Sequence, residues 1–160
     1  MKTNLIRYVS LALLLLWMCV IFTFSAQKAE ASGELSSDFA ARIVSAFYPG
    51  FNDLSESEKA EIIDKIFIPV RKAAHFTEFF ILGALAFTFF CTFTSLSLRL
   101  KAILPLLLGV LYAVSDEVHQ LFVDSRGCSF SDVCIDSAGV LLAVIAGLLI
   151  MRKKRGESVG

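Results

Sequence analysis

The sequence predicts an all-α fold, namely an integral membrane bundle of four transmembrane helices with two short amphipathic interfacial helices in the outer loop between spans one and two. The 160 residues are 56% hydrophobic and 19% charged, with a mean hydropathy of +0.71, which is more apolar than an ordinary soluble domain. The apolar residues also fall into blocks near the length that crosses a bilayer. We expect a single membrane domain over residues 1–160, with spans at about 5–24, 73–98, 102–123 and 133–151 and an outer loop at 25–72.

The first apolar block contains an almost unbroken leucine run from Leu11 to Leu16 and follows a basic N-terminus. These features fit a first transmembrane helix, but they also fit a secretory signal peptide, because Ala29-Glu30-Ala31 has the small-x-small form of a cleavage site. The block is long for the apolar centre of a signal peptide, and Trp17 resembles an anchor at the membrane surface. We therefore interpret it as a membrane span.

The outer loop begins with a predicted short amphipathic helix. Phe39, Ile43 and Phe47 recur at helical spacing and mark one apolar face. Pro49-Gly50 follows them and is expected to end the helix.

A second short helix is expected to begin at Ser55, because Ser55 and Glu58 form a capping-box pair. Ile62 and Ile66 continue its apolar face, and Pro69 is expected to end it. Both helices are too short and too charged to cross a bilayer, so we expect them to lie on its surface or over the ends of the spans.

Three more apolar blocks follow, at residues 73–98, 102–123 and 133–151. Pro105 and Gly109 lie inside the third span, which a membrane helix tolerates when neighbouring groups satisfy the freed carbonyls.

Lysine and arginine residues near the span ends predict the topology. They form three clusters, before span one, between spans two and three, and after span four. With four spans these clusters share one side, which the positive-inside rule identifies as the cytoplasm. Eight of the fifteen basic residues but only one of the fifteen acidic residues then lie on the cytoplasmic side. Both termini are therefore predicted to be cytoplasmic. The clusters are Lys2 and Arg7, Arg99 and Lys101, and Arg152, Lys153, Lys154 and Arg155.

Polar side chains recur at helical spacing at the start of span two, the end of span three and the start of span four. The predicted topology puts all three stripes near the outer surface. Unpaired ionisable groups are costly at that depth, so they should face one another, water or a ligand. We therefore predict an outer polar pocket, although helix geometry turns Glu117 about 100° away from Asp116. The candidate binding residues are Arg71, His75, Glu78, Tyr112, Asp116, Glu117, His119, Gln120, Arg126, Asp132 and Asp136.

Purely structural roles are the alternative for several of these residues. Asp132 can cap the fourth span together with Ser129, and Arg71 can anchor a helix end by reaching to the headgroups. The remaining histidines and carboxylates can form a network that holds helices together.

Two kinds of chemistry would use the same residues. A divalent metal could bind imidazole and carboxylate ligands at helical spacing, although no HExxH-type signature is present. Alternatively, general acid-base chemistry could act on a lipid-linked or cell-wall substrate, with Arg71 and Arg126 binding phosphate or carboxylate. The catalytic candidates are His75, Glu78, Asp116 and His119, and the metal candidates are these four and Asp136.

The four cysteines give a weaker signal. Cys19 and Cys91 lie within spans and are interpreted as small apolar residues. Cys128 and Cys134 lie on the outer side, and the sequence leaves open whether they form a disulfide.

Three polar stretches stand out, namely residues 71–79, residues 115–122, and Arg126 with Asp132-Val133, Asp136 and Gly139. They resemble the VanZ-like family, which comprises small bacterial membrane proteins named for a member associated with teicoplanin resistance. The resemblance covers nearly the whole chain, and the polar segment after span one also looks like the family. The chain departs from the family at two places. Phe79 stands where the family frequently has tyrosine, and Asp124-Ser125 stand where it frequently has Pro-Gly. The polar segment after span one comprises Phe24 to Gln27 with Ser32 and Ser36.

The resemblance implies that the first span is retained and that the protein has a role in the envelope of a bacterial cell, in the cytoplasmic membrane. It supplies no agreed reaction. We expect the outer pocket to bind an envelope component or an amphiphilic antibiotic. The alternatives are a metal-assisted or acid-base hydrolase or transferase acting on a lipid-linked cell-wall substrate, and a structural or adaptor protein.

The expected partners are membrane lipids and a lipid-linked cell-wall component or a glycopeptide antibiotic. Nucleic acid is not an expected partner, because the only basic run is the short one at the C-terminus.

Overall fold

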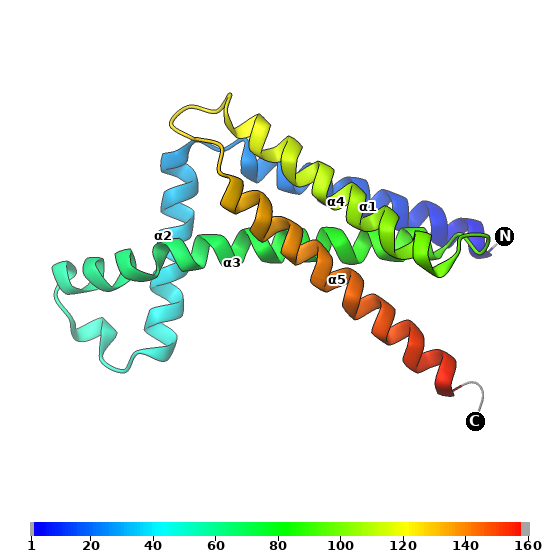
Figure 1. Cartoon of the computed structure of the whole chain (residues 1–160). Coiled ribbons are helices and arrows are strands. Elements are labelled where there is room, and N and C mark those ends of the chain that lie inside the picture. The colour runs from blue at the N-terminus through cyan, green and yellow to red at the C-terminus, as the bar shows by residue number, and fades with distance from the viewer. Residues whose placement is uncertain (1, 158–160) are drawn as a thin grey trace.

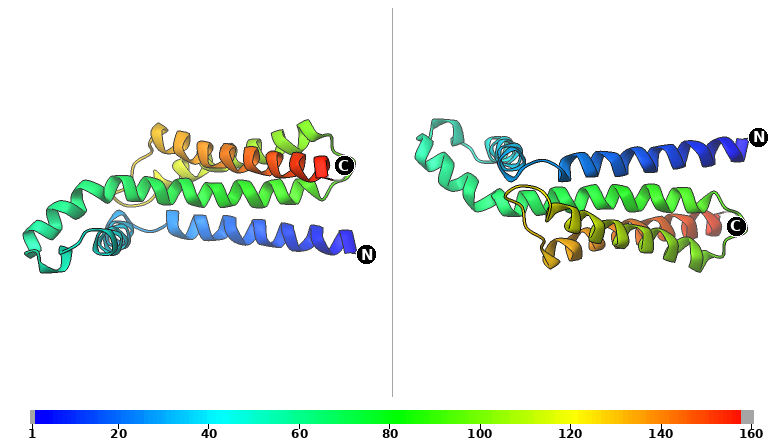
Figure 2. Two further views of the ribbon diagram at one scale, coloured as in Figure 1. Left: turned by 90° about the horizontal axis from the view of Figure 1, so that it is seen from below. Right: turned by 90° about the horizontal axis from the view of Figure 1, so that it is seen from above.

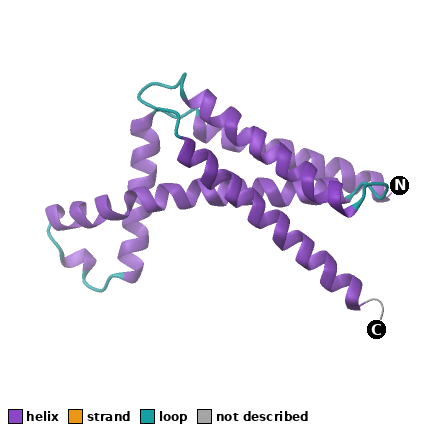
Figure 3. Ribbon diagram, in the orientation of Figure 1, coloured by secondary structure: helices purple, strands orange, loops and turns teal. Residues whose placement is uncertain are grey.

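The computed structural model describes residues 2–157, the side chains of residues 2, 3, 29, 31 and 154–157 excepted. The predicted basic side chains of Lys2, Lys154 and Arg155 therefore lie outside the described part. Within that part the chain forms helices joined by turns (Figures 1 and 3). The elements are α1 (Lys2–Ser25), α2 (Ala29–Phe47), the 3₁₀ helix η1 (Phe51–Asp53), α3 (Glu56–Cys91), α4 (Leu98–Gln120) and α5 (Phe130–Glu157).

Four of these helices are long and apolar enough to cross a membrane. This agrees with the predicted fold class, an all-α multi-pass membrane protein. The candidate spans are Asn4–Ser25, Glu56–Cys91, Leu98–Gln120 and Phe130–Lys153.

The two ends of the bundle carry different connections. Both termini and the α3–α4 turn lie at one end, whereas the α1–α2 turn and the α4–α5 loop lie at the other (Figure 2). At the terminal end, Arg7 Nη2 donates a hydrogen bond to the Thr92 carbonyl (3.3 Å), and the guanidinium lies 4.1 Å from the centre of the Phe93 ring. The three predicted basic clusters therefore belong to the same end of the molecule.

Helix α2 is longer than the sequence predicted. It begins at Ala29, well before Phe39, and extends for 19 residues to Phe47. It crosses α3 at a steep angle in Figure 1. The prediction that the helix ends at Pro49-Gly50 is consistent with the structure, because Gly50 adopts a left-handed conformation (φ 82°) before η1, which glycine accepts without steric cost.

The second short helix of the outer loop does not exist as a separate element, so this prediction was wrong. Ser55 forms the predicted capping box with Glu58, but the helix continues through Pro69 and joins the second span. Proline weakens a helix by removing one backbone hydrogen bond and crowding the preceding turn, and packing against neighbours can offset this cost. In Figure 2 the first turns of α3 are inclined to the rest of the helix.

The boundary between spans two and three also differs from the prediction. Helix α3 ends at Cys91, and a short turn leads to α4 at Leu98. Ser97, which was assigned to span two or its linker, is the N-cap of α4, and its Oγ accepts a hydrogen bond from the Leu100 amide (3.3 Å). A local hydrogen-bonding side chain thus starts α4 at Leu98, before the predicted start of span three at residue 102.

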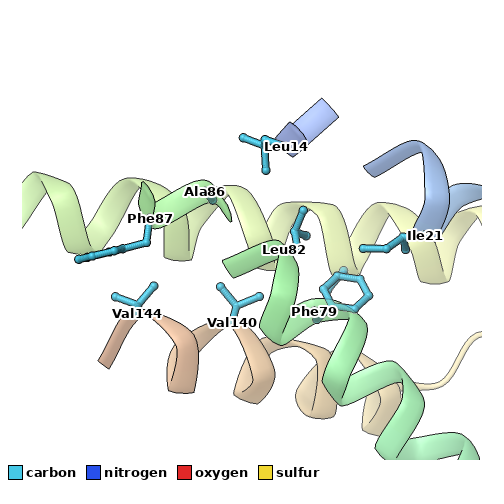
Figure 4. Packing of buried hydrophobic residues seen from close by; sticks show 9 residues of the cluster. Leu14, Ile21, Phe79, Leu82, Ala86, Phe87, Val140 and Val144 are labelled. Carbon is cyan, nitrogen blue, oxygen red and sulfur yellow. The ribbon is translucent and has the colours of Figure 1, made fainter. Parts of the chain in front are cut away.

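Helix α3 is central, because α1, α2, α4 and α5 all pack against it. The apolar core between the spans is shown in Figure 4. The approach of α5 to α3 is closest at Gly139, where a β-carbon would overlap the Phe76 carbonyl. The core residues are Leu14, Ile21, Phe79, Leu82, Ala86, Phe87, Ala113, Val140 and Val144.

The first span is tied to the bundle by two polar contacts. Trp17 Nε1 donates to the Glu78 backbone carbonyl of α3 (2.9 Å), and the Tyr112 hydroxyl of α4 donates to the Met18 carbonyl (2.6 Å). Trp17 therefore contributes to helix packing, whereas the sequence suggested a surface anchor.

Candidate functional site

A polar cavity of about 110 Å³ lies at the end of the bundle remote from the termini. Its walls come from α1, the α1–α2 turn, α2, α3, α4 and the α4–α5 loop, so segments far apart in sequence meet there. The lining residues are Ile21, Phe24, Ser25, Gln27, Ser32, Leu35, Ser36, Arg71, Ala74, His75, Glu78, Asp116 and Arg126.

Helix α3 provides one wall through the predicted stripe Arg71, His75 and Glu78. These residues share a face because they are four and three residues apart in a helix. The Arg71 guanidinium forms no hydrogen bond or ion pair with any residue that the structure describes. It is therefore a cation whose charge no carboxylate contacts.

Helix α4 provides the Asp116 carboxylate, which is buried. Gln120, one turn later, donates from Nε2 to Asp116 Oδ2 (3.1 Å) and to Ser25 Oγ of α1 (3.2 Å). Gln120 does not line the cavity, but it holds Asp116 and the end of α1 in position.

The α4–α5 loop provides Arg126. Its Nη1 donates to the Ser25 carbonyl (2.8 Å) and its Nη2 to Ser32 Oγ (2.7 Å), so Arg126 fastens the loop to the start of α2. Its Nε is buried and lacks a hydrogen-bond partner. Burial lowers the pKa of Arg126 from its ordinary value, and the nearby Arg71 cation adds to this shift. Two guanidinium groups of like charge, those of Arg71 and Arg126, therefore line the same cavity.

Behind His75, on α5, lies a second carboxylate. Asp136 is 0% exposed, and its Oδ1 lies 4.0 Å from His75 Nδ1. His75 Nδ1 and both Asp136 oxygens lack hydrogen-bond partners, which is uncommon for buried polar atoms. The imidazole therefore lies between the cavity and a buried carboxyl group.

A second, cationic cavity of about 260 Å³ adjoins the first and shares Arg71, His75 and Arg126 with it. Lys72 and Asp132 complete its charged lining. Their Nζ and Oδ1 atoms are 3.5 Å apart. Since Asp132 already pairs with Lys72, the two arginines have no acidic partner of their own in this cavity.

Asp132 lies in the first turn of α5, where an acidic side chain was expected. The proposed Ser129 cap is not formed through the side chain, because the Ser129 hydroxyl pairs with that of Ser131 (2.8 Å). The Asp132 amide instead donates to the Ser129 carbonyl (3.0 Å).

Five of the predicted binding residues line neither cavity. Two of them, Gln120 and Asp136, lie beside the lining residues Asp116 and His75. The other three lie elsewhere. Glu117 is buried on another face, where Oε2 accepts from the Ser129 amide (2.7 Å). Tyr112 bonds to α1. The His119 ring stacks on Phe22 of α1, with ring centres 4.5 Å apart. These side chains connect α4 to α1 and to the α4–α5 loop.

Sequence reasoning did not include four polar lining residues from the α1–α2 region, namely Ser25, Gln27, Ser32 and Ser36. The only sequence feature that pointed to these four residues was the resemblance of the polar segment after the first span to the VanZ-like family. Because α2 was expected to begin later, nothing in the periodicity placed these side chains beside Arg126.

The cysteines do not form the disulfide that the sequence left open. Cys128 and Cys134 are both free and exposed, as is Cys19. Cys91 is also free, and its Sγ lies 3.6 Å from Met151 Sδ.

The arrangement does not favour the metal alternative. Within the described part of the chain, no three His, Cys, Asp or Glu side chains lie close enough together to share a metal ion. His119, one of the proposed ligands, stacks on α1 at a distance from the polar cavity.

Comparison with known proteins adds the family. A family model described as VanZ/LLP1 matches residues 10–151. Searches of curated proteins and of solved structures found no match. The match covers most of the chain, includes the second and third spans and most of the first and fourth, and contains the lining of both cavities. The chain is therefore a multi-pass membrane protein of the VanZ/LLP1 family.

Proposed function

We propose that this protein is a bacterial cell-envelope protein of the cytoplasmic membrane that binds an envelope component or an amphiphilic antibiotic in its polar cavity. The observation that supports this proposal is the convergence of Arg71, Glu78, Asp116 and Arg126 from three separate segments on one cavity. Charged side chains at membrane depth are costly and commonly mark functional sites.

The distribution of basic residues supports placing the cavity in the outer leaflet. The three basic clusters belong to the opposite end of the bundle, and the positive-inside rule assigns that end to the cytoplasm. On this topology both termini are cytoplasmic. Helix α2 and the polar cavity then lie at the outer membrane surface, where they meet envelope components.

The size of the cavity limits what it holds. A volume of about 110 Å³ accommodates a small polar group with a few waters, not a whole glycopeptide. The ligand therefore inserts one group, such as a phosphate, carboxylate or sugar edge, and keeps the rest outside. Two guanidinium groups suit the anionic choices, because they bind such oxygens in pairs.

Teicoplanin tolerance is the first readout, since it is the property linked to the founding member of the family. A bacterial host that expresses the chain should tolerate more teicoplanin than the host alone. Glu78→Gln and Asp116→Asn should return tolerance to the level of the host, because they remove charge without changing side-chain shape. Growth inhibition and membrane protein level are measured together.

Glu61→Gln is the matched control, because Glu61 is an exposed carboxylate of the same helix as Glu78 and pairs only with Lys65 at the surface (2.8 Å). It should keep full tolerance. Full tolerance in both cavity variants, at normal membrane level, would contradict the proposed binding site.

Acid-base catalysis on a lipid-linked substrate is the second candidate function. The position of His75 between the cavity and the buried Asp136 favours it, because a carboxyl group behind an imidazole can orient it for proton transfer. This candidate requires turnover of a substrate, whereas the binding function does not.

A further inference from the structure

An apolar groove of about 350 Å³ lies between α1, α2 and α3. Trp17 of α1, Phe39 and Ile43 of α2, and Val70 and Ile81 of α3 form its walls. Phe39 is 56% exposed, so the protein itself does not cover the groove on the side of α2.

The polar groups along this groove are already satisfied. Thr77 Oγ1 donates to the Ala73 carbonyl (2.7 Å), and Trp17 Nε1 donates to the Glu78 carbonyl (2.9 Å). The groove therefore offers hydrocarbon surface, except at the Glu78 side chain.

The groove and the polar cavity are neighbours along α3. Ala74 and Glu78 line both of them, so one ligand can contact both at these two residues. From Val70 to Ile81 the helix rises by about 16 Å, close to the roughly 15 Å of hydrocarbon in one leaflet of a 30 Å core. The groove thus has the length of one lipid chain.

The charges of the cationic cavity are complementary to a phosphate, and Arg71 of this cavity follows Val70 of the groove along α3. Arg71 and Arg126 line both the polar and the cationic cavity. Arg126 Nε has no partner, and Asp132, the carboxylate of the cationic cavity, pairs with Lys72. A phosphate is the group that paired guanidiniums bind best.

From these features we propose that the ligand is a phosphate-bearing lipid, with its phosphate on Arg71 and Arg126 and one hydrocarbon chain in the apolar groove. This inference rests on the proposed function, because it names the ligand class of the same site. The lipid is held at two points, so neither the head nor the chain alone binds well.

The test is a binding measurement on the purified full-length chain in detergent micelles, with three probes. Dioleoyl phosphatidic acid carries both parts, dioleoylglycerol lacks the phosphate, and glycerol 3-phosphate lacks the chains. Phosphatidic acid should bind at least about tenfold more tightly than either of the others, because a charge-assisted hydrogen bond or a buried chain contributes on that order. Equal binding of dioleoylglycerol overturns the phosphate site, and equal binding of glycerol 3-phosphate overturns the lipid.

Variants locate the two parts of the ligand. Arg71→Gln should weaken phosphatidic acid binding by about tenfold and leave dioleoylglycerol unaffected. Ala73→Trp and Ile43→Trp fill the groove without touching the polar cavity, so they should weaken the binding of phosphatidic acid. Leu111→Trp is the matched control, because Leu111 is an exposed residue of α4 away from the groove. If both groove variants bind like the control and unfold at the same temperature, the placement of the chain is wrong.

Failure of this inference can be distinguished from failure of the proposed function. If Glu78→Gln and Asp116→Asn abolish tolerance but no probe lipid is preferred, the cavity functions with another ligand and the lipid proposal is overturned. If phosphatidic acid binds with the expected dependence on Arg71 and the groove, while those variants keep full tolerance, the lipid site stands and the role in tolerance fails.

Discussion

The side chains around the polar cavity differ in how well their hydrogen bonds are satisfied. Arg126 donates to Ser25 and Ser32, which explains its place in the fold. Asp136 is fully buried, yet neither of its oxygens has a partner, and His75 lies 4.0 Å away. A buried polar group without a partner costs about 1–3 kcal/mol. Stability alone therefore does not explain Asp136, and we propose that it has a functional role.

The first prediction concerns this carboxyl group. Asp136→Asn should leave the free energy of unfolding unchanged or raise it by about 1 kcal/mol, because the buried site no longer has to accommodate an acid. It should nevertheless lower teicoplanin tolerance, and any turnover of a lipid-linked substrate, because His75 loses the carboxyl group behind it. Thermal unfolding in detergent and growth inhibition measure the two effects.

Asp124→Asn is the matched control, since Asp124 is exposed and pairs with Lys28 at the surface (3.2 Å), where such pairs contribute little. This substitution should change neither the free energy of unfolding nor teicoplanin tolerance. Loss of more than about 1 kcal/mol of stability in Asp136→Asn would instead assign Asp136 a structural role.

Sequence periodicity identified which side chains are polar but not which helix each one faces. Asp116 and His119 are three residues apart and were assigned to one stripe. Their side chains point about 60° apart around a helix, and this difference is enough to put Asp116 in the cavity and His119 on Phe22 of α1. Only the position of α1, which the sequence does not specify, decides between them.

At the scale of the helices, composition predicted the four spans well and the outer loop less well. The apolar blocks are long, so their existence does not depend on any one residue. The interruption at Pro69 was misleading, because a proline predicts a helix end from local sterics alone. Contacts of α3 with α2 and the other spans are absent from such local reasoning, and they allow one helix to continue from Glu56 to Cys91.

The second prediction concerns the crossing of α3 and α5. Gly139→Ala should lower the free energy of unfolding by about 1–3 kcal/mol, because the new β-carbon overlaps the Phe76 backbone carbonyl and forces the two helices apart. Since His75 immediately precedes Phe76 on α3 and Asp136 lies about one turn before Gly139 on α5, ligand binding should fall as well. Thermal unfolding and phosphatidic acid binding are measured on the same preparation.

Gly127→Ala serves as the control for this substitution. Gly127 lines the cationic cavity, but a β-carbon there would meet no atom within 4 Å. Its stability should stay within about 0.5 kcal/mol of the parent chain. Equal stability of Gly139→Ala would mean that α3 and α5 can separate without cost.

At the scale of the whole molecule, the sequence predicted that the three polar stripes lie at the same membrane depth. Successive spans run in opposite directions, so the start of span two, the end of span three and the start of span four are on the same side. In the structure, Arg71, Asp116 and Arg126 do meet at one end, and the termini lie at the other (Figure 2). What the sequence could not supply is the course of α2, because its polar residues have neither a strong period nor an apolar block. Helix α2 closes the cavity through Ser32 and Ser36 and bounds the groove through Phe39 and Ile43.

The last prediction tests which end of the bundle faces outward, and the chain's own thiols provide the probe. Cys128, in the α4–α5 loop at the cavity end, is free and exposed, so a membrane-impermeant maleimide should label it in intact cells if that end faces outward. Cys134 lies near the start of α5 and is replaced together with Cys128 in the control. In a Cys128→Ser, Cys134→Ser background, Ser95→Cys places a thiol in the exposed α3–α4 turn at the terminal end. This thiol should react only after the membrane is permeabilised. Cys19 and Cys91 should add little label in either case, because a thiol within the hydrocarbon does not ionise to the reactive thiolate. The reverse pattern would place the polar cavity and the apolar groove in the cytoplasmic leaflet, where the cavity could not meet an extracellular antibiotic.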